Sequence, residues 1–200
     1  MKIVPDPPAS RPSAFLQTAQ SPFGSCNNAH ESLFHVNSGV IAEDALIHLS
    51  RHLQTAFETA TRIYNVTPML DTGLHWSTVW AVDAARALIE ALLKGADDVV
   101  LPPKDAEGGL FIPGTIRTTA EQAFGYFGAC DLPMFSVRSG VLAEDVLVHV
   151  SLYLQAAYTT ANEVCMLTPQ AAKGLHWATL HAIEAAMALT EGLLEGSDKI

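Results

Sequence analysis

Apolar side chains recur every three or four residues through two long parts of this chain, separated by stretches rich in proline and glycine. This period places them on one stripe of a helix and predicts helices over about 42–65, 68–94, 143–166 and 169–195. The first helix of each pair carries its stripe at Leu46, Leu49, Leu53, Ala56, Ala60 and Ile63, and at Leu147, Val150, Leu154, Ala157, Ala161 and Val164. Long paired helices are therefore the main predicted elements.

The pattern occurs twice. When the chain is shifted by 101 positions, about half of the residues in 34–95 are identical to their partners in 135–196. The segment Gly73–Trp76, for example, falls on Gly174–Trp177. Self-similarity at a fixed spacing is typical of repeated structural units. We therefore predict two copies of one fold unit.

Each copy opens with a short alternating segment, Leu33–Val36 in the first, whose period of two predicts a brief strand. Ser38–Gly39 then forms a turn. Thr67–Pro68 is typical of the start of a second helix, which Gly95 would end. A short connection makes the two helices an antiparallel αα-hairpin. The predicted fold is mainly α: two tandem copies of a short strand plus αα-hairpin, packed as a pseudo-two-fold four-helix bundle.

A second stripe lies roughly 100° around the first helix of each copy, and it differs little between the copies. It consists of Glu43, Ile47, Ser50, Gln54 and Phe57 in the first copy and of Glu144, Val148, Ser151, Gln155 and Tyr158 in the second. One copy of about 80 residues would be marginally stable alone. We interpret this stripe as the surface on which the copies pack, with a partner chain as the alternative.

The chain divides into four segments. Residues 1–14 hold four prolines and are predicted to be disordered. Residues 15–95 form the first repeat and 118–196 the second. The intervening residues, 96–117, contain several prolines and glycines and are predicted to be a linker.

Each copy also carries a recognisable order of motifs: Phe-x-Val, a Ser-Gly-Val turn, Glu-Asp, a first helix, and a second helix that contains Trp and ends in leucines. This order resembles a group of short, functionally uncharacterised bacterial proteins, known only as a domain of unknown function. The resemblance covers about 34–95 and 135–196. It implies that two units which usually occur singly, in what would be a homodimer, are fused here. It implies no activity and no catalytic residues.

Composition narrows the classes of partner. The chain is 49% hydrophobic and 16% charged, with a net charge of −10. Its basic residues form no cluster, so we expect neither nucleic acid nor an anionic membrane surface as a partner. No uncharged apolar run reaches the roughly 18 residues that span a membrane. The first residues lack the apolar run of a signal peptide, so a cytoplasmic location is expected.

Histidines are kept at two equivalent pairs of positions, His48 with His149 and His75 with His176. A metal ion needs such groups to converge within about 2.1 Å of it. Within one copy, His48 and His75 would lie roughly 15 Å apart along the hairpin. A pair that spans the copies, such as His48 with His149 at the pseudo-two-fold axis, stays open. We interpret the histidines as structural and predict no metal and no cofactor.

Other candidate groups also have simple structural explanations. Trp76 and Trp177 are interpreted as core anchors, with an aromatic ligand pocket as the alternative. Glu43–Asp44 lies in a first helical turn, where the helix dipole favours negative charge. Adjacent helical carboxylates point about 100° apart, unlike a catalytic pair. The three cysteines share no motif and do not align between the copies. We therefore predict that the protein is not an enzyme.

The leading hypothesis is a non-enzymatic interaction or regulatory module that acts through helical apolar faces, with a protein partner or self-association. The alternative is a small-molecule or metal-binding helical bundle. The candidate binding residues under these two hypotheses are Ile47, Gln54, Phe57, Val148, Gln155, Tyr158, His75, Trp76, His176 and Trp177.

Overall fold

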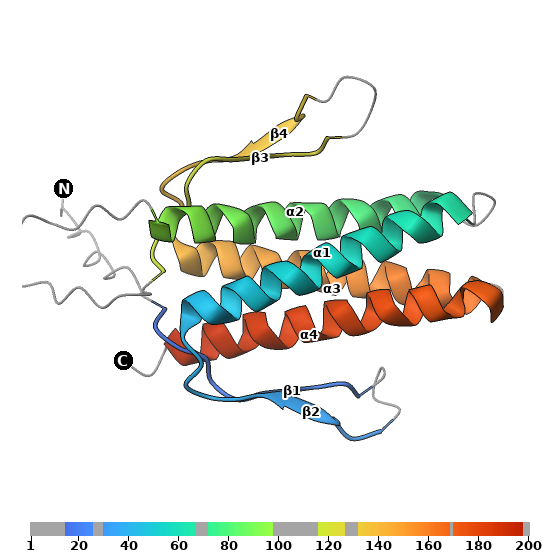
Figure 1. Ribbon diagram of the computed structural model, residues 1–200, viewed down its shortest axis with the longest axis horizontal. Helices are drawn as coiled ribbons and strands as arrows, with labels where there is room; N and C mark the ends of the chain where they lie inside the picture. Colours follow the sequence, from blue (N-terminus) through green and yellow to red (C-terminus); the bar gives the residue numbers. More distant parts are fainter. Residues whose placement is uncertain are drawn as a thin grey trace, which may run out of the picture.

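Four long helices and two strand pairs make up the computed structural model, which describes residues 15–25, 30–66, 72–97, 116–126, 132–168 and 170–197 (Figure 1). The first copy contains β1 (Ser21–Phe23), β2 (Phe34–Val36), α1 (Ala42–Val66) and α2 (Thr72–Asp97). The second contains β3 (Gln122–Phe124), β4 (Phe135–Val137), α3 (Ala143–Leu167), a 3₁₀ turn (Gln170–Ala172) and α4 (Lys173–Ser197). The predicted mainly helical fold is confirmed. The predicted disordered segment 1–14 and most of the predicted linker 96–117 lie outside the described residues.

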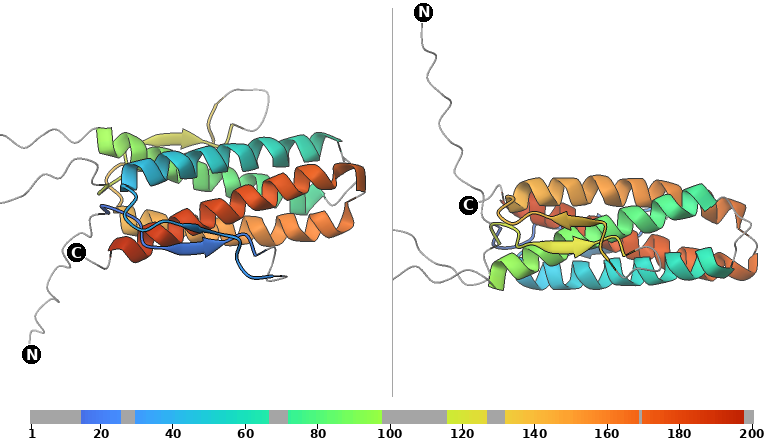
Figure 2. Two further views of the ribbon diagram at one scale, coloured as in Figure 1. Left: turned by 60° about the horizontal axis from the view of Figure 1, so that its bottom comes forward. Right: turned by 90° about the horizontal axis from the view of Figure 1, so that it is seen from above.

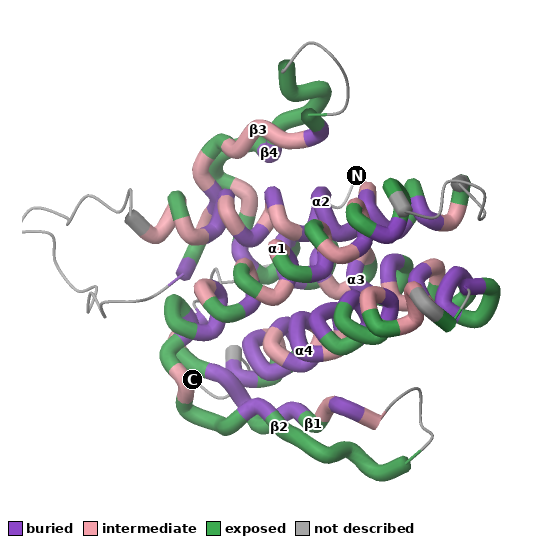
Figure 3. Tube along the Cα trace, turned by 45° about the vertical axis from the view of Figure 1, so that its right-hand side comes forward, coloured by how far each residue is buried: buried purple, intermediate pink, exposed green. Residues whose placement is uncertain are grey.

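The helices follow the predicted apolar stripes. Every stripe residue of α1 and α3 is at most 3% exposed, so the stripes form the core of the bundle. Glu43 and Asp44 occupy the first turn of α1, where the helix dipole stabilises negative charge. Figure 3 shows the buried residues along the inner faces of the helices.

The second helix of the second copy, α4, begins at Lys173, later than predicted, and α2 is described from Thr72. Thr168 does not start α4; it ends α3, where its backbone N–H donates to the carbonyl of Cys165. The predicted start at Thr67–Pro68 lies outside the described residues. A few residues of 3₁₀ turn therefore precede α4 where the pattern predicted continuous helix.

The two copies form one bundle in which each first helix contacts both second helices. α1 packs against α2 and α4, and α3 packs against α4 and α2 (Figure 1, Figure 2). Two hydrogen bonds of 2.7 Å between threonine hydroxyls join the copies, Thr59 with Thr179 and Thr78 with Thr160. The shift of 101 residues exchanges these two pairs, so a pseudo-two-fold axis relates the copies.

The copies do not meet along the predicted second stripe. The side chain of Gln54 accepts a hydrogen bond from Arg86 on α2 at 3.0 Å, and the Tyr158 hydroxyl donates to Glu184 on α4 at 2.9 Å. Both contacts lie within one copy, so the interpretation of this stripe as the surface between copies is wrong. On that flank the two helices of each αα-hairpin contact one another. The opposite flank of the first helix, which carries Thr59, contacts the other copy.

Each copy contributes a two-stranded antiparallel hairpin. Phe23 lies opposite Phe34, and Phe124 lies opposite Phe135. The strands β2 and β4 match the predicted brief strand, whereas their partners β1 and β3 were not predicted. Each hairpin crosses to the other copy, so that β1–β2 lies on α4 and β3–β4 lies on α2 (Figure 1). This exchange places one hairpin on each side of the bundle.

Glycines allow these crossings. Gly95 and Gly196 lie inside the last turns of α2 and α4, so the predicted helix stop at Gly95 is wrong. A Cβ atom at Gly95 would overlap the backbone carbonyl oxygen of Thr118, and one at Gly196 would overlap that of Gln17. The predicted turn is confirmed at Gly39, whose φ of +84° suits glycine.

Candidate functional site

Each hairpin holds a pair of phenylalanine rings over the helix beneath it. The ring centroids of Phe23 and Phe34 are 5.5 Å apart with an interplanar angle of 33°. Phe124 and Phe135 repeat the same distance and angle. The two sides of the molecule can therefore be compared residue by residue beneath an identical aromatic pair.

A pocket of about 200 Å³ lies beneath the β3–β4 hairpin, with Phe124, Ala84 and Tyr153 in its lining. Trp80 packs beneath the same hairpin, against both phenylalanine rings. Its ring, on α2, lies 4.9 Å from the ring of Phe135 and nearly edge-on to it. Its ring lies 5.8 Å from that of Phe124. Both separations are in the range of favourable aromatic contacts. We call this side of the molecule, β3–β4 with α2, the closed half.

Beneath the β1–β2 hairpin, His181 stands at the position equivalent to Trp80, and His52 stands at the position equivalent to Tyr153. A pocket of about 290 Å³ is found here between the hairpin, α4 and α1. Its lining includes Phe23, Phe34, His52, His181, Ala182 and Ala185. We call it the aromatic pocket, and this side of the molecule, β1–β2 with α4, the open half.

The aromatic pocket is apolar except for its two imidazoles. Ala182 and Ala185 are buried beneath it. Burial, and secondarily the nearby His48, lowers the pKa of His52. His52 is therefore mostly neutral at pH 7, so its ring offers one N–H donor and one acceptor nitrogen. An apolar cavity of about 150 Å³ admits benzene, so the aromatic pocket has room for one ring system.

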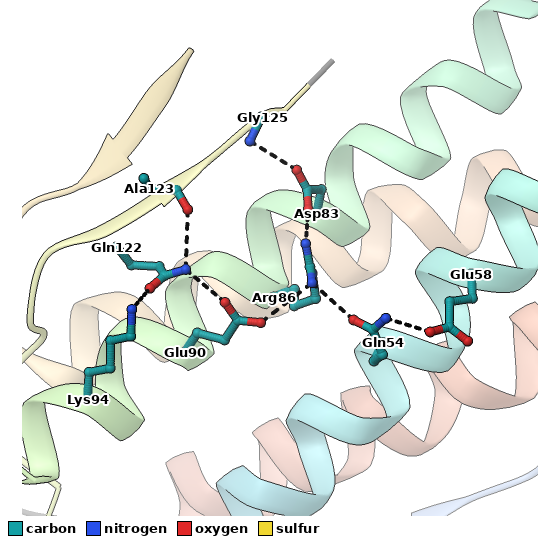
Figure 4. A network of polar contacts seen from close by, with 9 residues as sticks. All are labelled: Gln54, Glu58, Asp83, Arg86, Glu90, Lys94, Gln122, Ala123 and Gly125. Atoms are coloured by element: carbon teal, nitrogen blue, oxygen red, sulfur yellow. Dashed lines mark hydrogen bonds and ion pairs between the residues drawn. The ribbon is translucent and has the colours of Figure 1, made fainter. Parts of the chain in front are cut away.

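A polar network in the closed half joins α2 to α1 and to β3 (Figure 4). Arg86 donates a hydrogen bond of 2.7 Å to Asp83 and lies 3.6 Å from Glu90. Its guanidinium carbon is 4.9 Å from the centre of the Phe57 ring. Asp83, which is 3% exposed, also accepts a hydrogen bond of 3.2 Å from the backbone N–H of Gly125. The network is completed by Gln54, Glu58, Lys94, Gln122 and the Ala123 carbonyl.

His75 and His176 lie at the pseudo-two-fold axis, with ring centroids 5.8 Å apart, and both are buried. A hydrogen bond of 2.8 Å joins Nε2 of His176 to the hydroxyl of Thr168. Burial, and secondarily His75, lowers the pKa of His176 to about 4. The candidate pair of His48 with His149 at the axis is wrong, because both are exposed and lie on helices that are diagonal in the bundle.

The structure places the predicted tryptophans at the surface. Trp76 and Trp177 are each 46% exposed, so their interpretation as core anchors is wrong. Adjacent helical residues point about 100° apart, and burial of His75 and His176 turns the tryptophans outward. Of the other predicted binding residues, Ile47, Gln54, Phe57 and Tyr158 are half-buried, and Val148 and Gln155 are exposed.

The described part of the chain contains no group of three or more His, Cys, Asp or Glu side chains that could hold a metal ion. None of its helices is both long enough and apolar enough to cross a membrane. The aromatic pocket is therefore the feature from which a function is argued.

The aromatic pocket was not predicted from the sequence. Its helical residues His52 and His181 are positions at which the copies differ, with Tyr153 and Trp80 as their counterparts. These two differences were the available signal. They gain meaning only from the fold, because the residues come from helices of different copies and meet under one hairpin.

Comparisons of this chain with models of protein families, with curated proteins and with solved structures find no significant match. The resemblance to short bacterial proteins of unknown function stays a prediction. A functional proposal must therefore start from the geometry of the chain itself.

Proposed function

We propose that this protein binds a small molecule with a planar aromatic ring in the aromatic pocket, without catalysing a reaction on it. The observation that carries the proposal is the indole of Trp80, which occupies the equivalent place in the closed half, 4.9 Å from the ring of Phe135. Phe23 and Phe34 have the geometry of the pair that contacts this indole. A ring in the aromatic pocket would meet the same aromatic faces.

The imidazoles give the pocket polar selectivity. Small-molecule sites are mostly apolar and carry a few polar groups that fix the ligand's orientation. A neutral His52 can donate to a ligand carbonyl or accept from a ring N–H. At about 290 Å³, the pocket is at the lower end of the range for drug-sized ligands, about 300–1,000 Å³. One mono- or bicyclic ring is therefore favoured over a large cofactor.

Indole is the direct probe of this proposal. Titration followed by ligand-observed NMR should show one site with a Kd on the order of 0.1–1 mM, as expected for so few ligand atoms. The variant His181→Trp places the chain's own indole in the pocket and should abolish binding. Ala178→Trp adds the same side chain at an exposed position of α4 and should bind indole like the parent. Unchanged binding by His181→Trp would contradict the proposal.

A second function, self-association, is favoured by an exposed apolar end of the bundle. Trp76 and Trp177 are each 46% exposed there, and Met166 and Leu167 are 77% and 61% exposed. Apolar patches of this kind mark interaction sites. The proposed occupant is a second copy of the chain, whose same exposed end would meet this one across a two-fold axis in an isologous contact.

Sedimentation velocity tests this second function. The wild-type protein should dimerise at micromolar concentrations, and the double variant Trp76→Glu with Trp177→Glu should be monomeric. The double variant Leu33→Glu with Leu132→Glu removes exposed apolar side chains from the hairpins and serves as the control that still dimerises. A monomeric wild-type protein would rule the second function out.

A further inference from the structure

A second pocket, of about 190 Å³, adjoins the aromatic pocket in the open half. The two pockets share Phe23 and Gly24, but the second extends toward α3 whereas the aromatic pocket extends toward α1. The helical side chains that line it include Tyr158, Glu184, Met187 and Glu191. We call it the acidic pocket.

The equivalent place in the closed half is occupied by Arg86 (Figure 4). The shift of 101 residues carries Phe57, Asp83, Arg86 and Glu90 onto Tyr158, Glu184, Met187 and Glu191. The open half therefore keeps the aromatic ring and both carboxylates of this arrangement. It replaces only the cation, and it does so with an apolar side chain.

The carboxylates of the acidic pocket are held by neutral groups. The Tyr158 hydroxyl donates to Glu184 at 2.9 Å, and the Ser21 hydroxyl donates to Glu191 at 3.2 Å. In the part of the chain that the structure describes, no Lys, Arg or His forms an ion pair with either carboxylate. These hydroxyls position the carboxylates without neutralising them.

The charged residues of α2 and α4 differ in the same sense, with cations on α2 and none at the equivalent positions of α4. In the closed half, α2 carries the cations Arg86 and Lys94, which take part in the network of Figure 4. At the equivalent positions α4 carries Met187 and Glu195. The open half thus has three glutamates at positions where the closed half has two carboxylates and two cations, and this makes its potential more negative than that of the closed half.

We propose that the acidic pocket receives the guanidinium or primary ammonium group of an organic cation whose aromatic ring lies in the aromatic pocket. This inference rests on the proposed function, because it names the class of the same ligand. In the closed half a guanidinium lies 4.9 Å from the Phe57 ring and 2.7 Å from Asp83. Tyr158 and Glu184 would offer a ligand the same two contacts, and the forked donors of a guanidinium match carboxylate geometry.

The fold also sets the spacing of the two groups of the ligand. His181 and Met187 are six residues apart on α4, as Trp80 and Arg86 are on α2. A rise of 1.5 Å per residue places such positions about 9 Å apart along the helix. A short alkyl chain, rather than a direct bond, must therefore join the ring to the cation.

The experiment titrates the protein with three probes: indole, agmatine, and indolyl-alkylguanidines of increasing chain length. The best alkylguanidine should bind about five- to tenfold more tightly than indole, since it adds a charge-assisted contact. Added NaCl should reduce this gain, because the pocket is open to solvent. Agmatine, which lacks the ring, should bind more weakly than the best alkylguanidine.

Two variants and one control locate the gain in affinity. Met187→Arg supplies the acidic pocket with the chain's own guanidinium, as in the closed half, and should remove the gain while leaving the affinity for indole unchanged. Met166→Arg adds the same charge at an exposed position of α3 and should keep the gain. Glu184→Gln with Glu191→Gln should also remove the gain.

The outcomes separate this inference from the proposed function. If indole binds but no alkylguanidine binds more tightly, the cationic ligand is refuted and the proposed function stands. If neither indole nor any alkylguanidine binds, both are refuted. If the gain survives Met187→Arg, the cation binds elsewhere and the assignment to the acidic pocket is wrong.

Discussion

In the open half His181 and Met187 border two pockets beneath β1–β2, whereas in the closed half Trp80 and Arg86 occupy the equivalent places. The closed half keeps one pocket, of about 200 Å³, between β3–β4, α2 and α3. The phenylalanine pairs above these positions have the same ring separation in both halves. The backbone arrangement is thus kept, while two helical positions decide whether the chain itself occupies the places of the aromatic and acidic pockets. A side chain that fills a site in one copy therefore indicates which chemical group of a ligand the other copy can bind at the equivalent site.

A single chain that contains both copies permits this difference, whereas a homodimer does not. In a homodimer each substitution appears on both sides, so opening one pocket would open both. The carboxylate of Asp83 is buried beside Arg86, and removing that cation twice would destabilise both sides. In a single chain the closed half can supply stability while the open half keeps its pockets.

The largest effect on the free energy of unfolding is expected when Arg86 of the closed half is replaced by methionine, the residue at the equivalent position of the open half. Arg86→Met leaves Asp83 buried without its cation, so we expect the free energy of unfolding to fall by about 3 kcal/mol. About a quarter of the Arg86 side chain is exposed, which keeps the loss below that of a fully buried pair. Urea unfolding followed by circular dichroism measures it.

The control for this prediction is Arg51→Met, at an exposed position of α1, which should change the free energy of unfolding by less than about 0.5 kcal/mol. A loss below about 1 kcal/mol in Arg86→Met would show that the network contributes little to the stability of the closed half.

The next largest effect is expected for Trp80→His. This change removes the ring contacts with Phe124 and Phe135 and should lower the free energy of unfolding by about 2 kcal/mol. It should also create a second indole site, so that NMR titration shows two sites per chain. The reciprocal double variant, Trp80→His with His181→Trp, should return to one site. One site in the single variant would mean that the halves are not equivalent.

The helices could be predicted because burial imposes its period on the sequence. The stripe from Leu46 to Ile63 is apolar at every position that faces the core, and the structure buries all of it. The strand partner of β2 could not be predicted in the same way. Ser21–Phe23 has three residues, one of them proline, and so shows no period. The exchange of hairpins between copies depends on backbone passage over Gly95 and Gly196, which no local pattern encodes.

The candidate site was harder to predict for a related reason. Residue type predicts burial only on average, and Trp76 is exposed because its neighbour His75 takes the buried direction. The aromatic pocket depends on a side chain that is smaller in one copy than in the other: His181 stands at the position equivalent to Trp80. Comparing the copies reveals such a difference, but only the fold shows that His52 and His181 face the same phenylalanines.

A smaller effect on the free energy of unfolding is expected when the pH is lowered. It arises at His75 and His176, where the two copies meet. The pKa of His176 is lowered to about 4 by burial and by His75. The unfolded chain therefore binds a proton there before the folded chain does as pH falls. This part of the stability is fully present above about pH 6.5 and is lost progressively toward pH 4. Between pH 6.5 and 5 we expect a loss of about 1.5 kcal/mol.

Urea unfolding at several pH values measures this loss, and His176→Gln should reduce the slope between pH 6.5 and 5. Glutamine keeps a donor and an acceptor near the hydroxyl of Thr168 but does not titrate in this range. NMR of the folded wild-type protein gives an independent check, because the ring of His176 should stay neutral down to about pH 4. A midpoint near pH 6.5 would contradict the prediction.

The smallest effect is expected for His181→Trp, which gives the open half the side chain of the closed half. The indole should gain contacts with Phe23 and Phe34 and raise the free energy of unfolding by about 1 kcal/mol. The gain should be smaller than the loss in Trp80→His, because His52 stands where the closed half has Tyr153. Urea unfolding measures it, and Ala178→Trp, on the exposed face of α4, should show no gain. A destabilisation of more than about 1 kcal/mol would mean that the space beneath β1–β2 does not accept an indole, and the closed half would then no longer indicate the ligand of the open half.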